Sequence, residues 1–102
     1  MNEYQLCLTD GAREDLEALY DFLLQFDIAT ADRALQAIDS AFNALCKHPY
    51  ICRKAANGEL GSRIRELVID FGATGYLALF EISDEETVTV FAVRHQRESD
   101  YH

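Results

Sequence analysis

Apolar side chains in the first part of the chain follow two different periods. Residues 4–8 alternate apolar and polar positions, which predicts a short strand. Thr9-Asp10-Gly11 then offers a helix cap, and the apolar spacing changes to i, i+3, i+4, i+7. We therefore expect an amphipathic helix that ends near Phe26. Its apolar stripe consists of Leu16, Leu19, Tyr20 and Leu23.

The same helical spacing returns after an interruption at residues 27–30. It predicts a second helix from about Ala31 to Lys47, which Pro49 ends. Its apolar face consists of Ile38, Ala41, Phe42 and Leu45. Two successive helices joined by a short turn are expected to pack as an antiparallel helical hairpin.

Strand patterns fill the second half of the chain. Residues 48–62 are expected to form a loop, because Asn57-Gly58 and Gly61 are turn signals. Three strands follow, separated by turns at 72–75 and 83–86: Arg63 to Phe71, Tyr76 to Ile82 and Thr87 to Arg94. The order β-α-α-β-β-β predicts one α+β domain over residues 1–102, with an N-terminal strand, a helical hairpin and a three-stranded antiparallel meander.

Two of these strands are apolar on both faces. Residues 76–80 are wholly apolar, and residues 88–93 are nearly so. Such strands need cover on both sides, but one helical hairpin covers only one face of the sheet. We expect the other face to lie bare and to receive a partner protein. The alternatives are that the C-terminal tail or the 48–62 loop covers it, or that the sheet curls on itself.

Charge is distributed unevenly along the chain. The formal net charge is −9, and residues 1–40 carry nine acidic and two basic side chains. An acidic surface repels phosphate backbones, which argues against tight non-specific nucleic-acid binding. Basic side chains outnumber acidic ones only between Lys47 and Arg65, where they form either a local patch or a solvated loop.

The sequence indicates no cofactor and no metal. Cys7, Cys46 and Cys52 are an odd number without CxxC spacing, which is typical of reduced, buried thiols. Cys46, His48 and Cys52 would supply three zinc ligands, but a structural zinc site needs a fourth. Phosphate-loop, HExxH and GxSxG motifs are absent. No apolar run is long enough to span a membrane and no export signal is present, so we expect a cytoplasmic protein.

Side chains that could carry chemistry are concentrated at the end of the last strand. Arg94, His95, Arg97 and Tyr101 lie there, and the strand that starts near Arg63 is expected to bring Arg65 to the same end of the sheet. Arginines beside His and Tyr could bind a phosphate and move protons, the minimum for cleaving RNA through its own 2′-hydroxyl. A polar strand end that is merely solvated is the alternative.

The chain resembles the RelE/ParE superfamily of bacterial toxins, and its ParE-like branch most closely. The resemblance covers nearly the whole sequence, and strand-Arg-His-Gln-Arg-Glu at the end is its most specific part. The segments that carry it are Ala12-Arg13-Glu14-Asp15-Leu16, Leu45-Cys46-Lys47-His48-Pro49, Arg63-Ile64-Arg65-Glu66-Leu67, Gly75-Tyr76-Leu77-Ala78-Leu79-Phe80 and Val93-Arg94-His95-Gln96-Arg97-Glu98-Ser99-Asp100-Tyr101.

This resemblance implies a toxin that is made with a cognate, ParD-like antitoxin, which lays an extended segment across the toxin's helices and sheet. Such an antitoxin would cover the bare face. DNA binding would belong to the antitoxin, since this chain has no helix suited to reading a groove. The antitoxin-binding candidates are Leu16, Leu19, Tyr20, Leu23, Leu77, Leu79 and Phe91.

The resemblance leaves the target open between two branches. RelE-like toxins cut mRNA on the ribosome, whereas ParE-like toxins poison DNA gyrase without a known catalytic step of their own. The net charge of −9 and the loose match of the C-terminal residues favour gyrase inhibition by protein contact. The alternatives are an mRNA endonuclease and an inactive homologue that only binds antitoxin. Candidate target-binding residues, catalytic if the chain is a ribonuclease, are Arg65, Arg94, His95, Arg97 and Tyr101.

Overall fold

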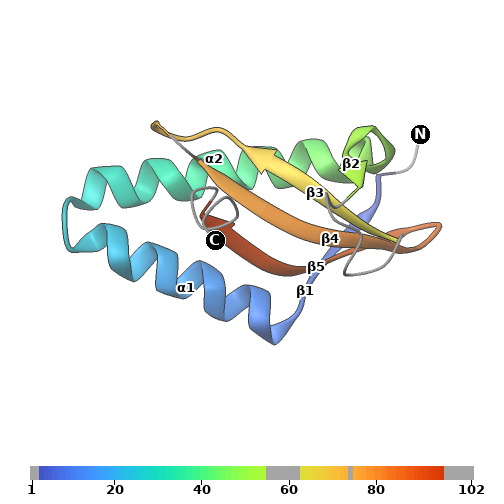
Figure 1. Ribbon diagram of the computed structural model, residues 1–102, viewed down its shortest axis with the longest axis horizontal. Coiled ribbons are helices and arrows are strands. Elements are labelled where there is room, and N and C mark those ends of the chain that lie inside the picture. Colours follow the sequence, from blue (N-terminus) through green and yellow to red (C-terminus); the bar gives the residue numbers. More distant parts are fainter. Residues whose placement is uncertain (1–2, 55–62, 74, 96–102) are drawn as a thin grey trace.

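The computed structural model describes residues 3–54, 63–73 and 75–95, and Figure 1 shows their arrangement. The predicted α+β order, a strand, two helices and an antiparallel meander, is confirmed. No helix within the described ranges is both long and apolar enough to cross a bilayer. The elements are β1 (Gln5–Leu8), α1 (Asp10–Leu24), α2 (Ile28–Lys47), the 3-10 turn η1 (Pro49–Ile51), β2 (Arg53–Lys54), β3 (Ile64–Ile69), β4 (Tyr76–Asp84) and β5 (Thr87–His95).

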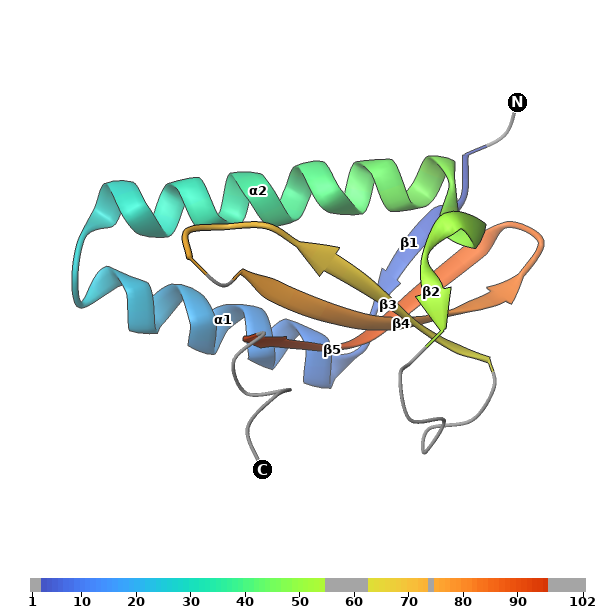
Figure 2. The ribbon, with the colours of Figure 1, turned by 45° about the horizontal axis from the view of Figure 1, so that its top comes forward.

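The strands form one sheet in the order β1-β5-β4-β3-β2. β1 runs parallel to β5, and the other neighbours are antiparallel. Between β3 and β4 the chain turns through Gly72 and Gly75, whose φ angles of 61° and 83° lie in the region that favours glycine. Figure 2 shows both helices on one side of the sheet, side by side and antiparallel. The helices therefore cover one face of the sheet.

Short polar side chains start the two helices. The Thr9 hydroxyl accepts a hydrogen bond from the Ala12 N–H at 3.1 Å, which caps α1. The Asp27 carboxylate accepts from the Ala29 N–H at 3.2 Å and from the Thr30 hydroxyl at 2.7 Å. Because Asp27 is this cap, α2 begins at Ile28 rather than near Ala31 as the apolar stripe predicts. Apolar spacing does not detect the first turn of a helix when that turn is exposed.

Asp27→Ala is expected to destabilise the start of α2 in a pH-dependent way. Hydrogen bonds from Thr30 and the Ala29 N–H hold the pKa of the Asp27 carboxyl below its usual value. The folded chain therefore binds this proton less readily than the unfolded chain, and the carboxylate stabilises the fold at neutral pH. That contribution is lost as the pH falls through the lowered pKa. Urea midpoints of the two proteins should differ at neutral pH and converge in acid, and a gap that does not change would contradict this role of the charge.

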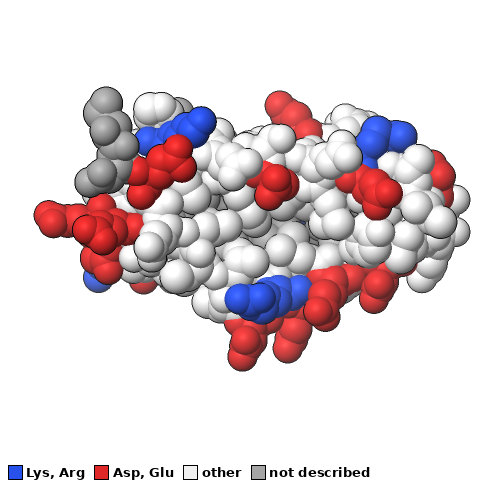
Figure 3. Space-filling view, turned by 180° about the vertical axis from the view of Figure 1, so that it is seen from behind, with Lys and Arg blue, Asp and Glu red and all other residues white. Residues whose placement is uncertain are grey.

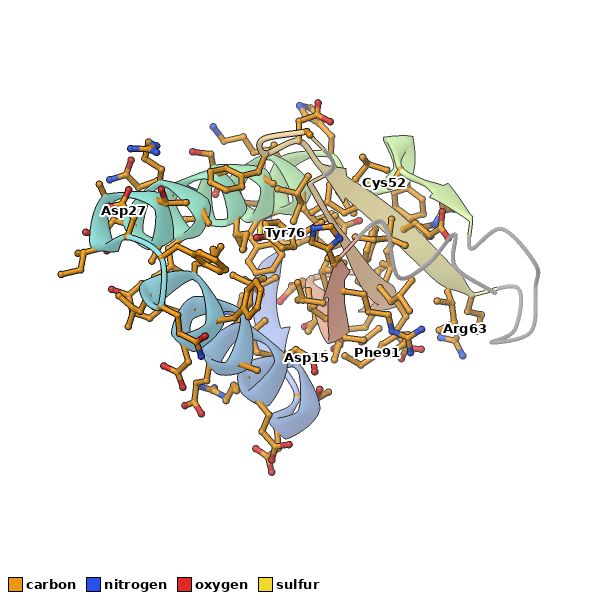
Figure 4. All side chains as sticks on the ribbon, turned by 60° about the vertical axis from the view of Figure 1, so that its left-hand side comes forward. Asp15, Asp27, Cys52, Arg63, Tyr76 and Phe91 are labelled. Atoms are coloured by element: carbon orange, nitrogen blue, oxygen red, sulfur yellow. The ribbon has the colours of Figure 1, made fainter. Side chains whose placement is uncertain are left out.

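The main core lies between the helices and the sheet. Phe80, Val88 and Val90 have no exposed surface and pack with apolar side chains from both helices. One polar contact crosses the same layer, since the Val93 N–H donates to Asp15 Oδ2 at 2.9 Å. Figure 4 shows Asp15 on α1, on the side that faces β5. This contact fastens the first helix to the last strand.

The expectation that the second face of the sheet lies bare is wrong for its central residues. Leu77 and Leu79 of β4 are 6% and 4% exposed, and they pack with Ile64, Ala92 and the half-buried Phe91. Parts of the alternative cover, residues 55–62 and 96–102, lie outside the described residues. A strand that is apolar on both faces indicates that both faces need cover, but not how much of that cover the chain itself supplies.

Residues 48–54 are more ordered than the predicted loop. Pro49–Ile51 form η1, and Arg53–Lys54 pair with Glu66 and Arg65 as the edge strand β2. A two-residue strand has no periodicity of its own, so only its pairing with β3 reveals it. The rest of the predicted loop, residues 55–62, lies outside the described residues.

Candidate functional site

Arg65 of β3 faces the turn that follows α2. Its Nη1 donates to the Cys52 carbonyl oxygen at 2.7 Å and to the Tyr50 carbonyl oxygen at 3.4 Å. The guanidinium carbon also lies 5.4 Å from the centre of the Tyr50 ring, a cation–π contact. The Tyr4 ring meets the Tyr50 ring edge to face at 6.5 Å. Arg65 therefore ties η1 and the residue after it to the sheet.

Arg94 and His95 occupy the end of β5. Arg94 pairs with Leu77, and His95 pairs with Tyr76 at the start of β4. The His95 ring meets the Tyr76 ring edge to face, with the ring centres 5.6 Å apart. The ring of Phe71, which follows β3, stacks on the Tyr76 ring with the centres 6.1 Å apart. Burial raises the pKa of the Tyr76 hydroxyl, so that group stays protonated at neutral pH. Figure 4 shows Tyr76 between the sheet and the helices.

The structure does not bring Arg65 and Arg94 together. Arg65 pairs with Phe80, which belongs to the core beneath the helices, whereas Arg94 pairs with Leu77 on the opposite face. Paired residues share a face, so the two guanidinium groups project from different sides of the sheet. The hypothesis that Arg65 lies beside the C-terminal candidate residues is therefore wrong as far as Arg94 is concerned. Arg97 and Tyr101 lie outside the described residues.

A β-bulge causes this separation. Phe80 pairs with Val90 and Leu79 pairs with Ala92, so Phe91 is an extra residue in β5. One extra residue moves every later side chain to the other face. Without the bulge, Arg94 would lie on the helix side with Val88 and Val90. Nothing in the local pattern of residues 88–93 marks which residue bulges.

The antitoxin-binding candidates fall into three environments. Leu16 and Tyr20 line an open groove that Leu35 of α2 borders from the other helix. Leu19 and Leu23 pack against the main core, so they hold α1 on the sheet. The meander candidates, Leu77, Leu79 and Phe91, form the second cluster described above.

Sequence reasoning missed three exposed apolar side chains at the tip of the helical hairpin. Phe22, Phe26 and Ile28 are 57%, 70% and 67% exposed. The Phe22 and Phe26 rings meet edge to face at 5.2 Å. Their i, i+4 spacing lies outside the main stripe and could have marked them as a second apolar patch. Tyr50, which is 62% exposed beside Arg65, had no such signal.

The expectation that the three thiols are buried holds for Cys46 and partly for Cys52, which is half-buried, but is wrong for Cys7, which is exposed. Burial raises the pKa of the Cys46 thiol and of the Cys52 thiol, although Arg65 opposes that effect at Cys52. Raised values keep a thiol protonated and unreactive at neutral pH. Within the residues that the structure describes, no three His, Cys, Asp or Glu side chains gather into a group that could hold a metal ion.

Comparison with known proteins identifies the class of this fold. The structure superposes on a chain of the chromosomal ParDE toxin–antitoxin system of P. aeruginosa with a TM-score of 0.71 and 18% identity, covering 91% of this chain and 96% of that one. It superposes on a chain of the RelBE2 toxin–antitoxin complex of Mycobacterium tuberculosis with a TM-score of 0.63 and 27% identity, covering 93% of each. The fold is that of the RelE/ParE superfamily.

Sequence comparison gives the family. Residues 6–100 match the family model of the ParE toxin of the type II toxin–antitoxin system parDE. The chain is also 32% identical over 87 residues to Toxin RelE3 of Caulobacter vibrioides, covering 85% of this chain and 88% of that relative. The chain therefore belongs to the ParE toxin family, within the RelE/ParE superfamily of type II toxin–antitoxin toxins.

Proposed function

We propose that this chain inhibits DNA gyrase by protein contact and that a cognate antitoxin neutralises it in the cytoplasm. The separation of the two arginines carries the proposal. Arg65 holds η1 against the sheet through its hydrogen bond to the Cys52 carbonyl oxygen. Arg94 lies on the other face of the sheet. Arg65 and Arg94, two of the residues predicted to share one site, therefore do not converge on one phosphate, as phosphate cleavage without a metal would require. The net charge of −9 also opposes binding to RNA.

An antitoxin partner is supported by the solved relatives, which come from toxin–antitoxin systems. The apolar groove between α1 and α2 and the exposed hairpin tip are surfaces that such a partner could cover. The chain would act as one domain over residues 1–102. Its contacts with gyrase would include residues of the strand end, where Arg94 is exposed.

A ribosome-dependent mRNA endonuclease is the second candidate function. The observation that favours it is a relative named Toxin RelE3. Arg94 and His95 both lie at the end of β5, but they pair with Leu77 and Tyr76 and so project to opposite faces of the sheet. Arg94 would then bind the phosphate on its own face. Arg97 and Tyr101 would complete this site in that case.

The deciding experiment compares two targets with the same purified chain. The gyrase proposal predicts that supercoiling stops and cleaved DNA accumulates, while in vitro translation continues. Arg94→Ala should weaken this inhibition, and Lys47→Ala, which replaces an exposed cation at the end of α2, should leave it unchanged. Cleavage of mRNA on ribosomes, abolished by Arg94→Ala or Tyr101→Phe, would establish the endonuclease instead. Induction without growth arrest would indicate a homologue that only binds antitoxin.

A further inference from the structure

The last part of β5 extends beyond the strand that pairs with it on one side. β1 pairs with β5 along residues 5–8 only, and its last partner is Val90. The Thr9 N–H adds one bond to the Val90 carbonyl oxygen at 3.1 Å, and the chain then turns into α1. Among the described residues, no strand lies beside residues 91–95 on that side. This stretch contains both the bulge and Arg94, so the groups that bind its free edge decide how firmly Arg94 is held.

Two side chains from the start of the first helix bind this edge in place of a strand. The Thr9 hydroxyl donates to the Phe91 carbonyl oxygen at 3.4 Å, and the Val93 N–H donates to Asp15 Oδ2 at 2.9 Å. Figure 4 shows Asp15 and Phe91 next to each other, where α1 meets β5. We call Thr9 and Asp15 the α1 clamp. The clamp supplies the hydrogen-bond partners that a further strand would otherwise provide.

Asp15 differs from the other carboxylates of α1 in its direction. Glu14, Glu17 and Asp21 are exposed, and Figure 3 shows acidic side chains gathered over α1 along the lower edge of that view. Asp15 is instead half-buried beside Val93, which is 5% exposed. A buried N–H without an acceptor is costly, and a carboxylate is a stronger acceptor than a neutral oxygen. The bond is therefore a firm link between the helix and the end of the strand.

The clamp lies directly before the side chain on which the proposed function depends. Phe91 and Ala92 both pack on the outer face of the sheet, whereas Val93 lies in the main core. The next residue, Arg94, therefore projects to the outer face, where it is exposed. Holding the backbone of Val93 against α1 keeps the bulge closed. The exposed guanidinium group of Arg94 is then presented in one direction.

We propose that Asp15 is a positioning residue for Arg94. Its carboxylate holds the bulged end of β5 against α1 and so orders Arg94 before the target arrives. The inference rests on the proposed function, because it takes Arg94 as a contact with the target. An ordered contact residue loses less conformational entropy on binding, so the clamp strengthens inhibition although Asp15 touches no target itself.

Hydrogen exchange tests the clamp without any target. In Asp15→Ala, the Val93 and Arg94 amides should exchange at least about tenfold faster. The Val88 amide lies where β1 still pairs with β5 and should change much less. Asp15→Asn keeps an oxygen that can accept the Val93 N–H, so it should restore most of the protection. Glu14→Ala removes an exposed carboxylate from the same helix and should change neither amide. Unchanged exchange in Asp15→Ala, or no rescue by asparagine, would overturn the proposal.

A double-mutant cycle then connects the clamp to inhibition. Asp15→Ala should weaken gyrase inhibition by about three- to tenfold, and it should cause no further loss in a chain that already carries Arg94→Ala. Ile38→Val lowers stability from the core face of α2 and should leave inhibition intact. Additive losses, or an equal loss in Ile38→Val, would mean that Asp15 acts through overall stability and would overturn the proposal. Inactivity of the unaltered chain on gyrase would refute the proposed function and with it the role of Arg94, whereas unchanged exchange would refute the clamp.

Discussion

Phe80→Ala is expected to lower the free energy of unfolding by about 3–5 kcal/mol. Phe80 is 0% exposed at the centre of β4, between Arg65 of β3 and Val90 of β5, and its ring lies in the core beneath the helices. Truncation removes buried apolar surface. It also leaves a cavity between the sheet and the helices that neither layer can fill by itself. Small domains have about 5–15 kcal/mol of stability in total, so this loss removes a large fraction of it.

Urea unfolding followed by far-ultraviolet circular dichroism measures this effect. The matched control is Phe26→Ala, which removes the same ring from a position that is 70% exposed. That change should alter stability by no more than about 0.5 kcal/mol. A loss below about 1 kcal/mol for Phe80→Ala would mean that this ring is not the centre of the core.

Arg65→Ala is expected to lower the free energy of unfolding by about 2 kcal/mol and to release η1 from the sheet. The side chain donates to the Cys52 and Tyr50 carbonyl oxygens and lies against the Tyr50 ring, so one substitution removes three contacts. Lysine carries the charge, but its compact ammonium lacks the planar guanidinium that lies against the Tyr50 ring while Nη1 donates to both carbonyl oxygens. Arg65→Lys should therefore recover only part of the loss.

Hydrogen exchange distinguishes this positioning role from a loss of charge at the surface. The Cys52 amide, which donates to the Pro49 carbonyl oxygen at 3.4 Å, should exchange faster in Arg65→Ala. Arg63→Ala removes an exposed arginine two residues earlier in the chain and should change neither stability nor exchange. Figure 4 shows Arg63 at the start of β3, away from η1. If Arg65→Ala abolished target inhibition with stability and exchange unchanged, Arg65 would contact the target itself.

The helices show which features apolar periodicity predicts and which it does not. Spacing predicts the stripes Leu16-Leu19-Tyr20-Leu23 and Ile38-Ala41-Phe42-Leu45. All of these residues pack on the main core except Tyr20, which lines the groove between the helices. The ends of the helices were less accurate: α1 ends at Leu24 and α2 begins at Ile28. The exposed apolar residues at the hairpin tip, Phe22, Phe26 and Ile28, do not continue the core-facing stripes, and the cap at Asp27 is visible only through its hydrogen bonds.

The candidate site could be predicted only in part. His95 and Arg94 were correctly expected at the end of the last strand, because that position depends on chain order alone. Arg65 donates hydrogen bonds to the carbonyl oxygens of residues 50 and 52, which belong to a different segment of the chain. No local sequence pattern predicts such a contact. Likewise, the burial of Leu77 and Leu79 depends on neighbours that alternation does not identify.

By itself, the sequence determined the order of strands and helices and the side of each helix that packs inward, because both follow from local spacing and turn chemistry. It also determined the acidic character of the helical hairpin. Only the tertiary structure decided that Arg65 and Arg94 lie on opposite faces of the sheet, since a bulge at Phe91 shifts the register of β5 against β4. Register depends on how two strands pair, so the sequence of either strand alone does not determine it.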